Sequence, residues 1–193
     1  PDIAPAPVDF TFEQIAAIVV SLKRELKVDR ASLTIWGIFD NYPPYNWPLT
    51  VHRGGAEGWK AVINRAKAAG YLIGGYHAYS PQLEHDPNFD PRRIYQTDPD
   101  TADPVRRAIL RNRWLRTCSS LQLDFARTTL PRELRAAGQN GDFTDILGVY
   151  SGQECYDVSN HKHRRPLTRE QDMRNRDAVH AYIHDELNLP SWM

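Results

Sequence analysis

The sequence has little that would indicate a disulfide-stabilised, cofactor-bound or membrane protein. Its two cysteines, Cys118 and Cys155, are too few for a disulfide framework and lack the close spacing of paired metal ligands. No apolar run approaches the roughly 18 residues that cross a bilayer, and no basic and then apolar segment at the start indicates a signal peptide. We therefore expect no membrane association and no cofactor, and a secreted and a cytoplasmic location both stay open.

An excess of charge of one sign is also missing. The 24 Lys and Arg residues balance the 24 Asp and Glu residues, so no overall field would attract nucleic acid or an anionic membrane surface. A neutral ligand is the expected partner, and the sequence leaves the oligomeric state open.

No internal repeat or break in composition divides the 193 residues. The proline-rich residues 1–10 are typical of an extended leader. Residues 11–193 are long enough for one domain with a substantial core.

Helices and strands alternate along that domain. Capping boxes begin two helices, at Thr11 with Gln14 and at Thr168 with Gln171. Apolar spacing, a closing Gly70 and an Asp103-Pro104 start predict two more. The expected helices cover residues 12–26, 59–69, 105–115 and 168–187. The expected strands cover residues 32–36, 71–77 and 120–125.

Long segments follow each expected strand, at residues 40–55, 78–102 and 126–160. Strands alternating with helices predict an α/β fold with a parallel sheet, whose ligands bind where the strands end. A closed (β/α) barrel of the TIM type has eight units, whereas three or four are visible here. The chain is therefore expected to be a partial barrel or fragment, with an open sheet as the alternative.

Asp124 lies near the end of the expected leucine-rich strand at residues 120–125. A carboxylate in such a strand is costly unless it has a partner or a function. It is either catalytic or paired with an arginine such as Arg127. The other two strand ends carry Trp36, followed by Asp40, and His77, followed by Tyr79, and all would face one crevice.

Aromatic residues are dense in the same segments, including Tyr42, Tyr45, Trp47 and Tyr76. Sugar rings stack their apolar faces on aromatic planes while their hydroxyls need polar partners, so this mixture favours a carbohydrate ligand. A metal site at Asp157, His161 and His163 is an alternative. Because Arg164 and Arg165 follow directly and would repel a cation, no metal ligand is assigned.

With these residues assembled, the chain resembles bacterial glycosidase barrels of the α-galactosidase and endo-α-N-acetylgalactosaminidase superfamily. The resemblance extends over most of the chain. Its carriers are Ile35-Trp36-Gly37 with Asp40, Arg53-Gly54-Gly55, the segment from Ala68 to His77, Leu121 to Phe125, Glu154 to Asp157, and the histidine-rich stretch that leads to Glu170.

The resemblance implies a retaining glycosidase acting on α-linked galactose or N-acetylgalactosamine, with Asp124 as a strand-borne nucleophile. The second carboxylate would be a glutamate on a later strand, beyond Met193. The expected substrate-binding residues are Trp36, Asp40, His77, Tyr79, Glu154, Tyr156 and His163. A non-catalytic carbohydrate-binding barrel and a metal-dependent hydrolase using Asp124, His161 and His163 stay open as alternatives.

Overall fold

The computed structural model describes residues 10–38, 53–83, 89–97, 99–100, 106–109, 112–145, 147 and 151–192. Most of the expected leader and Asp40 lie outside the described residues, as do Tyr42, Tyr45 and Trp47. The predictions made for these positions therefore stay predictions.

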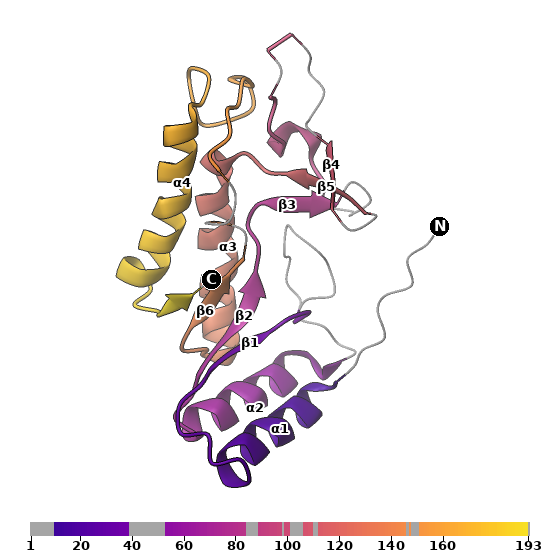
Figure 1. Cartoon of the computed structure of the whole chain (residues 1–193), viewed down its shortest axis with the longest axis vertical. Helices are drawn as coiled ribbons and strands as arrows, with labels where there is room; N and C mark the ends of the chain where they lie inside the picture. Colours follow the sequence, from indigo (N-terminus) through magenta and orange to yellow (C-terminus); the bar gives the residue numbers. More distant parts are fainter. Residues whose placement is uncertain are drawn as a thin grey trace.

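The described helices and strands alternate along most of the chain (Figure 1). In order they are α1 (Phe12–Arg24), β1 (Ser32–Ile35), α2 (Gly55–Ala68), β2 (Leu72–His77), β3 (Pro81–Leu83), the 3-10 turn η2 (Pro91–Arg93), β4 (Arg106–Ile109), β5 (Asn112–Arg116), α3 (Ser119–Ala137), β6 (Asp142–Thr144), α4 (Arg169–Ala181), the π-helical turn η3 (Tyr182–Glu186) and β7 (Ser191–Trp192).

A parallel sheet forms the centre of the fold, with strand order β1-β2-β6-β7. Its register pairs Thr34 with Gly74, Tyr76 with Phe143, and Phe143 with Trp192. The indole Nε1 of Trp192 donates a hydrogen bond of 3.0 Å to Thr34 Oγ1, which joins the two outer strands. The α/β class with a parallel sheet is confirmed, and the chain is a partial barrel of the TIM type.

A second, antiparallel sheet with order β3-β5-β4 interrupts the path from β2 to α3. The predicted helix at residues 105–115 is therefore wrong. Ladder hydrogen bonds from β3 and β4 on either side of β5 override the local helical pattern, which is a weak preference by comparison.

Two apolar clusters hold the helices in place. The first centres on Phe12, Trp59 and Ile73 and joins α1 and α2 to β2. The second joins α3 to α4 and η3, through Leu130, Val179 and Ile183. Both predicted capping boxes are confirmed, because the threonine and glutamine side chains bond reciprocally to the helix-start amides.

The predicted strand at residues 120–125 is also wrong, because these residues form the first turns of α3. Leucines at alternate positions suggested a strand. The buried side chains of α3 instead follow a spacing of three and four residues, which is that of a helix face. They include Gln122, Ala126, Leu130, Glu133 and Ala137.

The predicted long loop at residues 126–160 therefore contains the rest of α3 and the strand β6. Pro131, inside α3, is a residue that normally argues against a helix interior.

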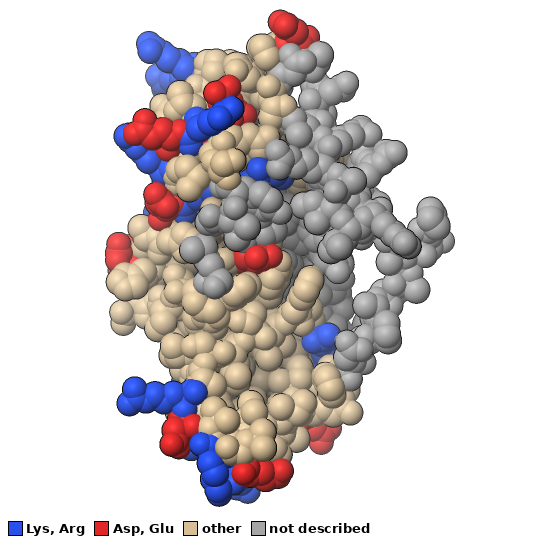
Figure 2. All heavy atoms as spheres, viewed as in Figure 1, with Lys and Arg blue, Asp and Glu red and all other residues tan. Residues whose placement is uncertain are grey.

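The described surface carries both signs of charge. On the face shown in Figure 2, Lys and Arg lie mixed with Asp and Glu, mostly toward the two ends of the molecule. No helix in the described part of the chain has the length and apolarity needed to cross a membrane.

Candidate functional site

Three side chains meet at the carboxyl ends of β1, β2 and β6, and we call Trp36, Tyr76 and Asp145 the strand-end group. The Trp36 and Tyr76 rings stack with centroids 4.9 Å apart and planes 16° apart. The Tyr76 hydroxyl donates a hydrogen bond to Asp145 Oδ2. This group combines an aromatic platform with an oriented carboxylate at the edge where parallel α/β folds bind ligands.

The backbone and the neighbouring rings fix the strand-end group. The Asp145 amide donates to His77 O over 2.8 Å, which continues the pairing of β6 with β2. On the other side of Tyr76, the Phe143 ring stacks at 5.7 Å. Arg53 Nη1 donates to Trp36 O over 2.8 Å. Trp36 keeps 58 % of its surface exposed, so its ring is available to a ligand.

His77, expected to hold sugar hydroxyls, lies on the opposite face of the sheet. It is fully buried, and its ring contacts Asp142 Oδ1 at 2.6 Å through Nδ1 and Glu133 Oε2 at 2.9 Å through Nε2. Because both ring nitrogens face carboxylates and none faces solvent, the structure contradicts a direct sugar contact. We call His77, Asp142 and Glu133 the buried histidine cluster.

The buried histidine cluster favours a charged imidazole. Burial alone would lower the pKa of His77, but the charges of Asp142 and Glu133, with their hydrogen bonds, outweigh it and raise that pKa to about 10. The imidazolium therefore compensates the carboxylates in the interior, where an unpaired charge is costly. Gly75 makes room for this arrangement, because a Cβ there would lie 3.0 Å from Glu133 Oε1 and 2.3 Å from Ile38 Cδ1.

Tyr79, also expected to bind sugar, is 5 % exposed and belongs to the apolar cluster of α3 and α4. Its ring stacks on that of His77 with planes 4° apart. The structure therefore places Tyr79 in the core and not in the strand-end group.

Asp124, the predicted nucleophile, lies on α3 with 47 % of its side chain exposed. Its Oδ2 is 2.5 Å from Lys162 Nζ, which is itself 58 % exposed. A helix position explains this orientation, because Asp124 falls outside the buried face of α3. The strand-borne placement is wrong, and the pairing with a cation resembles the structural alternative, with Lys162 in place of Arg127.

Glu154 and Tyr156 form a group on the loop that follows β6. The Tyr156 hydroxyl donates to Glu154 Oε2 over 2.8 Å, and its amide donates to Gln96 O over 2.8 Å. Glu154 also lies 3.7 Å from Arg169 Nε. A pocket of 280 Å³ opens beside them, lined by Thr97, Arg116, Ser151, Gly152, Gln153, Glu154 and Arg169. Sugar binding by Glu154 and Tyr156 stays a prediction.

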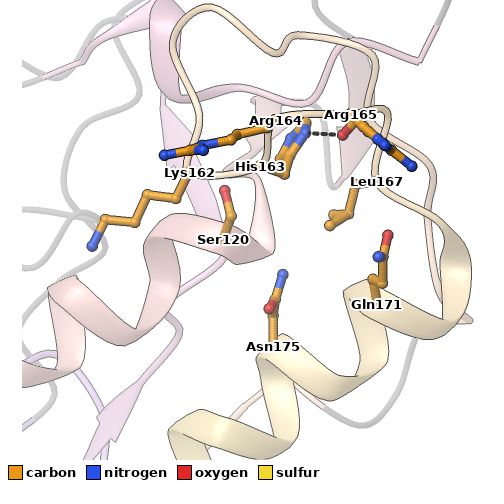
Figure 3. Close-up of a pocket in the computed structure, with 8 residues that line it drawn as sticks. All are labelled: Ser120, Lys162, His163, Arg164, Arg165, Leu167, Gln171 and Asn175. Atoms are coloured by element: carbon orange, nitrogen blue, oxygen red, sulfur yellow. Dashed lines mark hydrogen bonds between the residues drawn. The ribbon is translucent and has the colours of Figure 1, made fainter.

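His163 lies at a second pocket, of 520 Å³, between the starts of α3 and α4 (Figure 3). Its ring donates to Arg165 O through Nδ1 over 2.8 Å. Close by, four potential metal ligands come together in the described part of the chain: Cys118, Cys155, His161 and His163. Asp157 is not among them, because its carboxylate accepts hydrogen bonds from Ser159 and Asn160 in a local turn.

Sequence reasoning missed Asp145, because it falls in the segment expected to be a loop. A usable signal was present. The helix α3 ends at Gly138, which has a positive φ of 72°, and a short strand follows. The same order of helix, glycine and strand had identified Gly70 and β2.

Comparisons with known proteins place this geometry in a fold. The sequence matches no family model and no curated protein. Among solved structures, the chain is similar to the α-N-acetylgalactosaminidase of Bifidobacterium bifidum bound to Gal-NHAc-DNJ, with a TM-score of 0.80 and 22 % identity over 99 % of this chain and 30 % of that chain.

The chain is also similar to two α-galactosidases. That of Geobacillus stearothermophilus, from family GH36, gives a TM-score of 0.65 and 17 % identity over 92 % of this chain and 24 % of that chain. That of Lactobacillus brevis gives a TM-score of 0.60 and 12 % identity over 95 % of this chain and 24 % of that chain. The chain thus has the fold of part of a TIM-barrel glycoside hydrolase and spans about 30 % of the first of these proteins.

Proposed function

We propose that the chain forms part of the catalytic domain of a retaining glycoside hydrolase acting on α-linked galactose or N-acetylgalactosamine, with Asp145 as the nucleophile. The observation that carries the proposal is the strand-end group. It places a hydrogen-bonded carboxylate beside a half-exposed stack of Trp36 and Tyr76.

The parts of this group suit the chemistry. Trp36 offers a flat apolar surface for the C–H face of a pyranose ring. Asp145, at the end of β6, would attack the anomeric carbon while the Tyr76 hydroxyl holds its other oxygen in position. A retaining enzyme needs its acid/base carboxylate about 5 Å from the nucleophile, so that residue has to reach the same strand ends.

The choice of sugar comes from the neighbours of known structure. The Bifidobacterium bifidum enzyme was solved with GalNAc and the Geobacillus stearothermophilus enzyme with raffinose. Both ligands contain an α-linked or free galacto-configured sugar, which supports the substrate class. Sugar contacts by Asp40 stay a prediction within this proposal.

The decisive experiment compares Asp145→Asn with Asp124→Asn in the full-length protein, on aryl α-galactoside and α-N-acetylgalactosaminide. Removing the nucleophile should lower kcat at least about a thousandfold, which is about 4 kcal/mol of activation free energy, with the fold intact. Asp124→Asn, which removes only an exposed ion pair, should change kcat less than about twofold.

Three outcomes would contradict the proposal. Near-normal turnover by Asp145→Asn would exclude its nucleophile role, and loss of turnover only in Asp124→Asn would support the assignment from sequence. A first-formed β-anomer in the proton NMR spectrum would exclude retention. Binding without any turnover by the wild type would favour the non-catalytic carbohydrate-binding barrel.

A further inference from the structure

We propose that the chain binds a structural Zn²⁺ ion through four side chains, which we call the cysteine–histidine cluster: Cys118, Cys155, His161 and His163. One ligand atom from each residue lies within 4.8 Å of all the others. In tetrahedral zinc sites with bonds of about 2.0–2.3 Å, ligand atoms are roughly 3.3–3.8 Å apart. Cys155 Sγ is already 3.1 Å from His161 Nδ1, and Cys118 Sγ is 3.7 Å from His163 Nε2.

The hydrogen bonds of the two histidines prepare them for coordination. His161 Nε2 is 2.9 Å from Arg92 O, and His163 Nδ1 is 2.8 Å from Arg165 O. A carbonyl oxygen only accepts, so these nitrogens carry the protons. In the neutral rings the opposite nitrogens, which face the two sulfurs, then keep free lone pairs. Zinc-bound histidines show this arrangement, with the second ring nitrogen bonded to a carbonyl or carboxylate.

The surroundings of the sulfurs also fit a metal site. Both cysteines are fully buried, and Cys118 is the residue before α3, where the helix dipole favours a thiolate. Ser120 Oγ lies 3.3 Å from Cys118 Sγ. Two thiolates with two imidazoles form a closed set for Zn²⁺ with no open position, which is typical of a structural and not a catalytic site.

Charge balance answers the objection that Arg164 and Arg165 would repel a cation. Two thiolates neutralise one Zn²⁺, so the occupied cluster has no net charge and nearby arginines are tolerated. Both arginines are exposed, and Figure 3 shows their side chains extending to either side of His163.

The position of the cluster gives the ion a structural role. Cys118 lies at the junction of β5 and α3, whereas the other three ligands lie on the segment between β6 and α4. Cys155 pairs with Leu167 at both ends of that segment through two backbone hydrogen bonds. A zinc ion would therefore fix the loop bearing Glu154 and Tyr156 against the start of α3, and His163 would be a metal ligand and not a substrate contact.

The test measures metal in the full-length protein, purified under reducing conditions without chelator. Mass spectrometry of the elements should find close to one zinc ion per chain. Replacing zinc with Co²⁺ should give the visible absorption bands of a tetrahedral thiolate complex. A strong chelator should lower Tm, and hydrogen exchange should increase selectively at residues 151–167.

Matched histidine variants separate coordination from general damage. His163→Gln, at a half-buried ligand, should weaken zinc binding by more than about a hundredfold. His184→Gln, at an exposed histidine outside the cluster, should leave binding unchanged. If the reduced wild-type protein takes up no zinc, or if His163→Gln binds it as tightly as the wild type does, the proposal is wrong. This holds even if Cys118 and Cys155 form a disulfide in the oxidised protein.

Discussion

The two faces of the parallel sheet use the same residue types in opposite ways. On one face, Tyr76 and Asp145 lie at the strand ends beside the half-exposed Trp36. On the other face, their near neighbours His77 and Asp142 are fully buried against Glu133 of α3. Successive strand residues point to opposite faces, so adjacent positions belong to different environments. Burial and partners, and not residue type, therefore separate a candidate reactive carboxylate from a structural one.

His77→Gln should have the largest effect on stability. Losing the imidazolium leaves the carboxylates of Asp142 and Glu133 buried without a counter-charge, which should lower the free energy of unfolding by about 3–5 kcal/mol. Tyr76→Phe, one residue away on the other face, should lower it by less than about 1 kcal/mol. Urea denaturation of both variants measures the difference, and equal losses would remove the contrast between the faces.

The buried face should also make stability depend on pH. The pKa of His77 is about 10 in the folded protein and about 6.5 in an unfolded chain, so the folded protein holds a proton that the unfolded chain releases between these values. The contribution of His77 is complete below about pH 6.5 and is lost as the pH rises through about 10. Unfolding curves at pH 6.5, 8 and 9.5 should show this decline, and His77→Gln should flatten it.

Tyr76→Phe tests the open face. Without the hydroxyl that orients Asp145, kcat/KM of the full-length enzyme should fall about tenfold, equivalent to about 1.4 kcal/mol. The aromatic stack with Trp36 is preserved, so the change should fall mainly on kcat. Unchanged kinetics would mean that Tyr76 does not position a reacting group.

The smallest effect is expected at Asp124. Its ion pair with Lys162 is about half exposed, and such pairs contribute roughly 0–1 kcal/mol. Asp124→Asn should therefore change the free energy of unfolding by less than about 0.5 kcal/mol at ordinary ionic strength. A larger loss would show that α3 depends on this pair to hold the loop at Lys162.

Local signals in the sequence predicted the elements whose ends they mark. The threonine–glutamine boxes of α1 and α4 and the glycine between α2 and β2 act within a few residues, so they could be recognised directly. The first turns of α3 could not, because leucines at alternate positions suit a strand and only packing against α4 selects the helix. The error moved the candidate carboxylate from Asp145 to Asp124.

The cysteine–histidine cluster was beyond sequence reasoning for a different reason. Cys118 is separated from the other three residues by the whole of α3 and by β6. Only the folded chain brings these residues together, so no local spacing rule applies. His161 and His163 were noticed, but without the cysteines their surroundings looked too positive for a cation.

The hydrogen bond between Trp192 and Thr34 has a geometric consequence for the strand ends. In a flat sheet, strands β1 and β7 would lie roughly 14 Å apart, three interstrand spacings, which is farther than an indole and a threonine side chain can bridge. Their 3.0 Å contact requires the four strands to bend into an arc with Trp192 as a spacer on its concave side. Trp36 and Asp145 are thereby tilted toward a common centre, as a shallow cup requires.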